Sequence, residues 1–425
     1  MGRSASWSCR PESSRGQELN SAISSTSVRP RRRERIRRSL VLAPLLLLLI
    51  LWIWVFAAEG AFRGGVGGKA FGADAAMFIG AAHLLHDGGN PYDHLALYHA
   101  ESSLMAQQHL SMTPRVAVVR VGNPPLFFWA LEPLAMLPFA TVGFVWVSAL
   151  FLLSLAGALI TLRYAAWRAH VIPLLYFALM PPVILGAFYG NVIGLVFFAL
   201  AAALPLLTRM PFAAGALLAI AWLKPPVALP LVLLMVLFLT PRPWRVAAGF
   251  VATSALLLAL TLVATGAHSL IWWLHGLLGY SQDMGIQPDV ASLSGLYVRI
   301  VPTSLRLGLE IVSLGAAAAV TAAVWWRRRS PIPVPMLTAG WLWFAWLLAT
   351  PYAHFFDLIL LTPPVVALLG SNGARAAQWA PAGVLYLMFV ALFFINPVGG
   401  RVYLLPLPVL AAGYLVYRKR LSFQA

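Results

Sequence analysis

The chain has 425 residues, of which 60% are hydrophobic and only 10% are charged, and its mean hydropathy is +0.81. A soluble chain of this length would carry about 25% charged residues, so the composition excludes soluble, disordered and disulfide-scaffold proteins and indicates a polytopic membrane protein. The formal net charge of +17 would indicate nucleic acid in a soluble protein, but membrane proteins collect Lys and Arg in cytoplasmic loops. The single cysteine, Cys9, excludes an internal disulfide and a cysteine-based metal cluster.

The N-terminal part divides into a polar tail and an apolar run. Residues 1–39 are rich in Ser and Arg without an apolar period, which predicts a disordered basic tail in the cytoplasm. Residues 40–58 are apolar throughout and, at roughly 1.5 Å per residue, would extend about 28 Å, enough to span a bilayer. We interpret this run as an uncleaved anchor; the alternative is a cleaved signal peptide, whose apolar region is typically shorter.

Further apolar segments bring the expected number of spans to about twelve, in an all-α transmembrane bundle covering residues 40–417 and followed by a short cytoplasmic tail at 418–425. These segments are residues 139–162, 171–188, 191–207, 211–223, 227–239, 246–265, 303–325, 333–350, 357–370, 379–395 and 402–417. The pair around Lys224-Pro225-Pro226 is short, so residues 211–239 form either two spans or a re-entrant hairpin.

The distribution of charge orients this map. With the N-terminus inside, most of the 30 basic residues lie in the tail and the inner turns, as the positive-inside rule requires. Most of the 13 acidic residues, and every histidine except His170, lie on the outer side. We therefore expect a multi-pass protein of the cell membrane with both termini in the cytoplasm, titratable groups facing outward, and a charge excess that sets orientation rather than binding nucleic acid.

Two outer loops are long, residues 59–123 and 266–302. In the first, the sequence predicts a helix over residues 74–86 and a turn over residues 88–92. The Pro-punctuated apolar stretch at residues 123–138 suggests a helix lying at the membrane surface. We therefore expect the first outer loop to carry interfacial helices.

Asp74 is a candidate general base in this loop. Its neighbours are nearly all apolar, and burial raises the pKa of a carboxylate towards that of a base. The alternative is a helix N-cap, a position that Asp favours, and the two roles are compatible.

Lys224 and His354 are candidates from other parts of the chain. A cation between two apolar segments, as at Lys224, is costly and marks a site unless the side chain reaches the outer interface. His354 and Asp357 share a short outer turn, where they could orient an acceptor hydroxyl or relay a proton; the alternative is an interfacial aromatic belt with polar caps.

Arg299, at the end of the second long loop, could hold a lipid phosphate through its guanidinium group. A salt bridge with Glu310 would explain both residues equally well. The chain lacks a phosphate-binding loop, an HExxH motif and a dinucleotide fingerprint, and its residues do not call for a metal or a cofactor.

The order of these features resembles glycosyltransferase family 87, within the GT-C integral-membrane glycosyltransferases, from the first span to the last. The matching pieces are Asp74 with Ala81-Ala82, Gly89-Asn90-Pro91-Tyr92, Asn123-Pro124-Pro125-Leu126, Gly190-Asn191-Val192, Lys224-Pro225-Pro226, Ser292-Leu293-Ser294-Gly295 and Pro351-Tyr352-Ala353-His354. The chain departs from the family at Asn191, often Gln, at Asn123, often Tyr, and at Ala75, commonly a bulky residue.

The resemblance implies transfer of a sugar, often mannose, from a polyprenyl-phosphate donor to a hydroxyl of a glycan or glycolipid at the outer face, by one displacement with inversion. By this similarity Asp74 would be the base, His354 would orient the acceptor, and Lys224 and Arg299 would bind the donor phosphate. A transporter or lipid-linked-sugar flippase is the main alternative, and a membrane scaffold is a third. A transporter would carry charges near the midplane of both halves, where only Lys224 qualifies.

Overall fold

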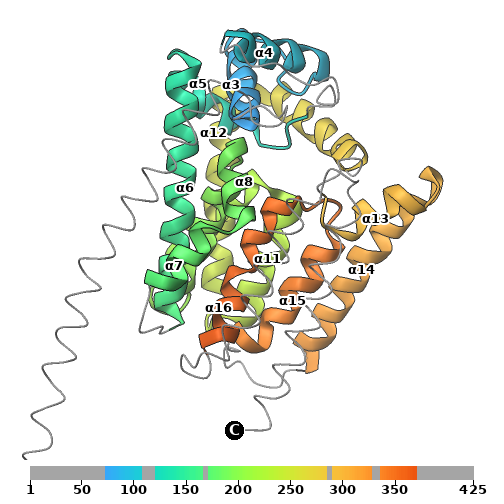
Figure 1. Ribbon diagram of the computed structural model, residues 1–425. Helices are drawn as coiled ribbons and strands as arrows, with labels where there is room; N and C mark the ends of the chain where they lie inside the picture. The colour runs from blue at the N-terminus through green and yellow to red at the C-terminus, as the bar shows by residue number, and fades with distance from the viewer. Residues whose placement is uncertain (1–71, 108–119, 166–170, 285–289, 328–335, 371–425) are drawn as a thin grey trace, which may run out of the picture. The chain divides into compact units, whose positions relative to one another are not determined.

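The computed structural model describes residues 72–107, 120–165, 171–284, 290–327 and 336–370. The predicted tail, the first predicted span and the last two predicted spans lie outside these residues. Within the described ranges the chain is helical and has no strand, which confirms the all-α expectation (Figure 1).

The helices follow the predicted apolar segments closely. On the N-terminal side they are α3 (Ala73–His86), α4 (His94–Gln107), α5 (Pro125–Ala135), α6 (Phe139–Tyr164), α7 (Val171–Ala178), α8 (Pro181–Tyr189) and α9 (Ile193–Arg209). They continue as α10 (Pro211–Leu218), the 3-10 helix η3 (Ala219–Leu223), α11 (Pro225–Phe238), α12 (Pro243–Met284), α13 (Leu293–Ile300), α14 (Thr303–Arg327), α15 (Met336–Ala349), the 3-10 helix η4 (Phe355–Leu361) and α16 (Thr362–Gly370).

Helices α3, α4 and α5 form a small cluster from the first predicted outer loop. Helix α3 packs against both α4 and α5. Helices α3 and α4 approach each other closely at Gly80, where an added Cβ would lie only 3.2 Å from the Cβ of Ala100. The sequence placed the helix of residues 74–86 and the turn that follows it correctly.

Prolines divide several of the predicted spans. The segment predicted at residues 171–188 is two helices, α7 and α8, because Met180 precedes Pro181 and takes extended backbone (φ −65°, ψ 129°). The span predicted at residues 246–265 ends where the helical backbone breaks, at Gly266 (φ 78°, ψ 165°), but α12 continues beyond this break to Met284, into the second predicted outer loop.

Three of the described helices are long and apolar enough to cross a membrane: Phe139–Tyr164, Pro243–Leu277 and Thr303–Arg327. The second and third bury only 17% of their most apolar window within the chain, so large apolar side chains face outward. Such exposure is unfavourable in water and favourable in lipid, which indicates a membrane protein. Figure 1 shows α11, α15 and α14 side by side, and α15 packs against both of its neighbours.

Candidate functional site

Asp74 lies in the first turn of α3, where its carboxylate reaches across to the turn between α8 and α9. The N-cap of α3 is Gly72, with a left-handed φ of 70°, and no side chain caps this end. The carboxylate Oδ2 of Asp74 accepts a hydrogen bond of 2.6 Å from the side-chain amide of Asn191. The N-cap interpretation of Asp74 is therefore wrong, and the side chain is positioned by a tertiary contact.

Asn191 is held by the turn between α8 and α9. Gly190 ends α8 with a φ of 75°, and the backbone N–H groups of Gly190 and Asn191 donate to the carbonyls of Ala187 and Gly186. The amide oxygen of Asn191 accepts from the N–H of Ile193 at 3.1 Å. Because that oxygen is already engaged, the amide nitrogen points to Asp74.

Gly190 also explains the small residue after Asp74. A Cβ at Gly190 would lie 2.9 Å from the Cβ of Ala75 and 3.2 Å from its backbone nitrogen. The indole N–H of Trp146 donates to the carbonyl of Gly190 at 2.8 Å and fixes the turn from the other side. A bulky residue at position 75 would have no room here, which accounts for this departure from the family pattern.

Lys224 is an ion-paired, buried cation rather than a lone one. It follows η3 and precedes α11, and its ammonium binds the carboxylate Oδ1 of Asp357. The side chains are 9% and 0% exposed, so the ammonium does not reach out to an interface. The ring centroid of Phe356 lies 4.7 Å from the Lys224 nitrogen and adds a cation–π contact.

The same carboxylate binds the turn that carries His354. Its second oxygen, Oδ2, accepts the backbone N–H of His354 at 2.9 Å. His354 is 5% exposed, and its ring stacks on Phe356 with centroids 5.0 Å apart. Asp357 therefore joins Lys224 to the His354 turn through its two oxygens.

The second long outer loop is bound to this turn. Val290 forms an antiparallel bridge with His354, and the N–H of Ala291 donates to the carbonyl of Ala353 at 2.6 Å. The hydroxyl of Ser292 accepts the N–H of Ala353 at 3.3 Å. The Ser-Leu-Ser-Gly motif and the His354 motif, more than fifty residues apart in sequence, are thus one structural unit.

The remaining motifs join this unit through backbone carbonyls. The Tyr92 hydroxyl donates to the carbonyl of Asn123 at 2.8 Å, and the Asn123 amide donates to the carbonyl of Leu223 at 2.9 Å. The hydroxyl of Thr350 donates to the carbonyl of Pro226 at 2.7 Å. The carbonyl of Pro226 has no helical donor because the residue four positions later is Pro230, and the N–H of Val227, four positions after Leu223, donates to Lys224 instead, so side chains satisfy both carbonyls.

Helix α8 and one apolar cluster connect the Asp74 contact to the Lys224 unit. Helix α8 packs against both α3 and η4, and the rings of Tyr189 and Phe356 lie 6.2 Å apart. Ala75 and Val192, which follow Asp74 and Asn191, belong to one buried cluster against which Leu223 packs. The candidate site therefore consists of two polar groups at the C-terminal end of α8.

Arg299 is the other residue expected to bind the donor phosphate. Its backbone belongs to α13, but its side chain lies outside the described part of the structure. Glu310, the alternative salt-bridge partner, accepts a hydrogen bond of 2.6 Å from the hydroxyl of Ser294. Among the described residues no group of three or more His, Cys, Asp and Glu is arranged to hold a metal ion.

Glu101 is a residue that the sequence analysis missed. It is 1% exposed on α4, and burial, with a smaller contribution from the charge of Asp74, raises its pKa to about 8. The signal was present in the sequence, because Glu101 falls on the helical period of Leu97, Leu104 and Met105. A carboxylate on the buried face of an amphipathic helix is uncommon, and this position indicates a functional or structural role for Glu101.

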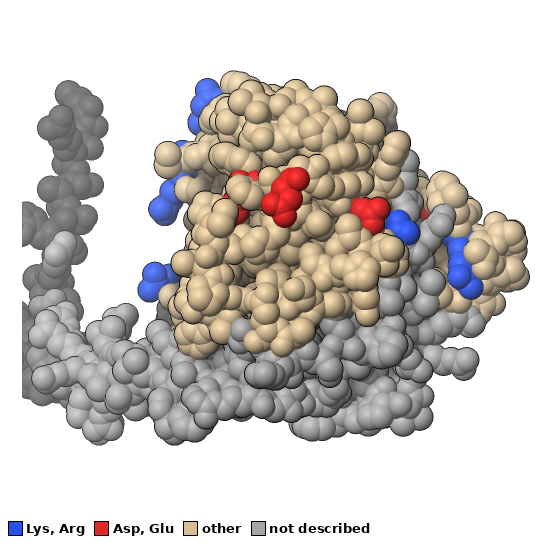
Figure 2. Space-filling model, turned by 90° about the horizontal axis from the view of Figure 1, so that it is seen from above, with Lys and Arg blue, Asp and Glu red and all other residues tan. Residues whose placement is uncertain are grey.

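The outer acids differ from Glu101 and Asp357 in exposure. Figure 2, seen from the end labelled α4 in Figure 1, shows a few acidic side chains on the described surface. Asp87 and Asp93 are exposed, whereas Glu132 is half-buried and 3.6 Å from the imidazole of His86. Burial thus sets Glu101 and Asp357 apart from these surface acids.

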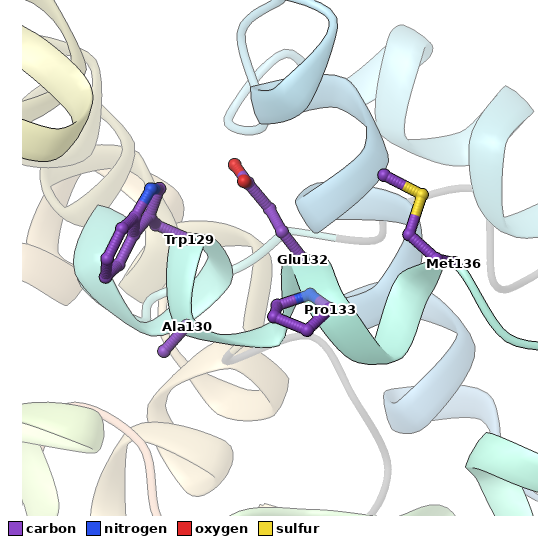
Figure 3. Close-up of a pocket in the computed structure, with 5 residues that line it drawn as sticks. All are labelled: Trp129, Ala130, Glu132, Pro133 and Met136. Carbon is purple, nitrogen blue, oxygen red and sulfur yellow. The ribbon is translucent and has the colours of Figure 1, made fainter.

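A hollow of about 490 Å³ lies along α5, lined by Trp129, Ala130, Glu132, Pro133 and Met136. Figure 3 shows Trp129, Glu132 and Met136 projecting from the helix on which all five residues stand. None of the residues predicted for the site lines this hollow. It is a feature of the α5 surface rather than of the candidate site.

A family model described as Glycosyltransferase family 87 matches residues 122–351, more than half of the chain. The chain belongs to glycosyltransferase family 87. The resemblance is confirmed, and the protein is a glycosyltransferase by family. Asn191, Lys224 and Arg299 lie within the matched residues, whereas Asp74 and His354 flank them. Neither a curated protein nor a solved structure matches the chain.

Proposed function

We propose that this glycosyltransferase moves a hexose, mannose in the first instance, from a polyprenyl-phosphate donor to a hydroxyl of a glycan or glycolipid at the outer face of the cell membrane. The observation that carries the proposal is the hydrogen bond that holds the Asp74 carboxylate at the end of α8, beside the Lys224 unit, in a chain of this family. A lipid-linked donor also fits a chain whose sequence has no nucleotide-binding motif.

The reaction is a single displacement with inversion. Asp74 takes the proton of the acceptor hydroxyl while the acceptor oxygen forms a bond to the anomeric carbon. The bond from that carbon to the phosphate oxygen breaks, and its electron pair remains on the polyprenyl phosphate. Asp74 suits the role of base because its carboxylate is partly exposed and its orientation is fixed by Asn191.

The other residues act on the acceptor and the leaving group. His354 helps to orient the acceptor, and Lys224 and Arg299 stabilise the charge that develops on the departing phosphate. An ammonium has three N–H donors, so the pairing of Lys224 with Asp357 is compatible with a further bond to a phosphate oxygen. The pair is close to neutral, however, which makes Arg299 the principal positive charge for the phosphate.

The decisive experiment is transfer by the purified full-length protein in liposomes with defined donors. We expect polyprenyl-phosphate mannose to support transfer to a mannoside acceptor, and glucose or arabinose donors to be poorer. Linkage analysis of the product should show inversion at the anomeric carbon. Movement of the donor lipid across the bilayer without any transfer would instead favour the flippase alternative.

The outward orientation is tested by labelling cysteines introduced at Gly88 and Arg327, in a background where Cys9 is replaced by Ser. A membrane-impermeant thiol reagent should label the first cysteine from outside intact cells and the second only after permeabilisation. Labelling of both cysteines from the same side would overturn the proposed location of the site.

A further inference from the structure

Glu101 is a buried carboxylate that has no role in the mechanism proposed above. Helix α4 turns Leu97, Glu101, Leu104 and Met105 inward, and α3 approaches so closely that a Cβ at Gly80 would lie 3.3 Å from the backbone nitrogen of Glu101. Its carboxylate oxygen Oε2 has no hydrogen-bond partner in the described part of the structure. A carboxylate in such a place is strongly disfavoured in its charged form.

The charged group that acts on Glu101 is Asp74. Helix α3 packs closely against α4 and approaches Glu101 at Gly80; of its titratable residues, His83 lies three residues, and Asp74 and His86 each six residues, from that glycine. Arg120 is the described Lys or Arg nearest in sequence after Glu101, and it is half-buried before α5. Burial first, and the Asp74 charge second, raise the pKa of Glu101 to about 8.

The two carboxylates have different surroundings. Asp74 is partly exposed and accepts an amide N–H from Asn191, which favours its ionised form. Glu101 is enclosed by apolar side chains, which favours its protonated form. A buried carboxyl that also lies in the field of a second negative charge keeps its proton to higher pH than a solvated one, because both effects disfavour its charged form.

We propose that Glu101 is the proton-holding partner of the base: at neutral pH the pair carries one proton on Glu101 and one negative charge on Asp74. Glu101 is a positioning residue, and this inference rests on the proposed role of Asp74. Ionisation of Glu101 in alkaline solution adds a second charge to the α3–α4 contact and loosens the helix that carries the base. Glu101 therefore sets the alkaline limit of sugar transfer.

The first test measures stability and needs no sugar transfer. Because the pKa of Glu101 is higher in the folded than in the unfolded chain, its stabilising contribution is complete below about pH 4.5 and is lost as the pH rises to about 8. We expect the thermal midpoint of the purified protein to fall over this range, and to fall less in Glu101→Gln. Glu132→Gln, a change at a half-buried carboxylate of α5, is the matched control and should follow the wild type. Equal slopes for Glu101→Gln and wild type would overturn the proposal.

The second test identifies the proton directly. Infrared difference spectra of the wild type should contain a protonated-carboxyl band that titrates near pH 8 and is absent from Glu101→Gln. In Asp74→Asn the neighbouring charge is gone, so the same band should titrate at lower pH. An unshifted band would contradict the pairing, and this measurement remains decisive if Glu101→Gln fails to fold.

The third test uses the pH profile of transfer. The decline of kcat above about pH 8 in the wild type should disappear in Glu101→Gln, and superimposable profiles would contradict the inference. If no donor supports transfer in any variant, the proposed function fails while the stability and infrared results still decide the state of Glu101.

Discussion

Asp74 and Asp357 are two carboxylates at the same end of α8 with opposite surroundings. Asp74 is partly exposed and is held by a neutral amide, whereas Asp357 is fully buried and is held by an ammonium and a backbone N–H. A base must meet its substrate and must release its proton afterwards, which an enclosed ion pair cannot do. The comparison is consistent with the proposed role of Asp74 as the base and with a structural role for Asp357, although both lie in short polar motifs.

The largest effect on activity is expected at Asp74. Asp74→Asn keeps the size and a hydrogen-bonding group but removes the proton acceptor, so kcat should fall by about 10²- to 10⁴-fold with little change in thermal midpoint. Asp87→Asn, at an exposed acid just after α3, is the matched control and should retain activity. Full activity of Asp74→Asn in the liposome assay would remove Asp74 from the role of base.

The largest effect on stability is expected at Asp357. Asp357→Asn leaves the Lys224 ammonium buried without its counter-ion, which typically costs about 3–5 kcal/mol. Thermal unfolding in detergent should show the loss, and the double variant Lys224→Met with Asp357→Leu should regain most of it. A stable single variant would mean that the pair contributes little to the fold.

The same double variant tests whether Lys224 also binds the donor, because it removes the ammonium without leaving a buried charge. If Lys224 also binds the donor phosphate, KM for the donor should rise by about tenfold while the protein remains folded. The control is Arg242→Met, at an exposed basic residue just before α12. An unchanged KM in the double variant would restrict Lys224 to its structural role and leave the phosphate to Arg299.

Asn191 tests whether the orientation of Asp74 matters. Asn191→Leu removes the 2.6 Å hydrogen bond, and we expect kcat to fall by about 10- to 150-fold, as the loss of one hydrogen bond to a charged group typically costs about 1.5–3 kcal/mol. The pH profile of kcat should shift to higher pH, because the amide no longer favours the ionised carboxylate. A lower thermal midpoint with unaltered kcat would make Asn191 a residue of the fold alone.

The smallest effect is expected at Gly190. Gly190→Ala places a Cβ on a backbone with a φ of 75° and 2.9 Å from Ala75, which should cost about 1–2 kcal/mol. Ala75→Gly in the same chain should relieve the contact but not the backbone strain. Partial recovery of the thermal midpoint would measure the steric contact with Ala75 separately from the backbone strain at residue 190. Full recovery would mean that the backbone strain contributes nothing.

Much of the fold could be predicted from the sequence because bilayer thickness and helical periodicity act locally. The segments at residues 139–162 and 303–325 correspond to α6 and α14 almost residue for residue. The division of residues 171–188 at Pro181 was missed, and so was the helical continuation of α12 after Gly266, in the second predicted outer loop. Hydrophobicity averaged over a window of residues identifies an apolar segment, but it does not reveal the backbone angles that a proline or a glycine imposes inside that segment.

The sequence by itself determined that this is a membrane protein, which family it resembles, and that Asp74, Lys224 and His354 stand in polar motifs between apolar segments. Only the tertiary structure decided what each of them binds. Lys224 meets Asp357 across 133 residues and Asp74 meets Asn191 across 117. Such partners are chosen by helix packing, because a buried charge must find its counterpart wherever the folded chain provides one.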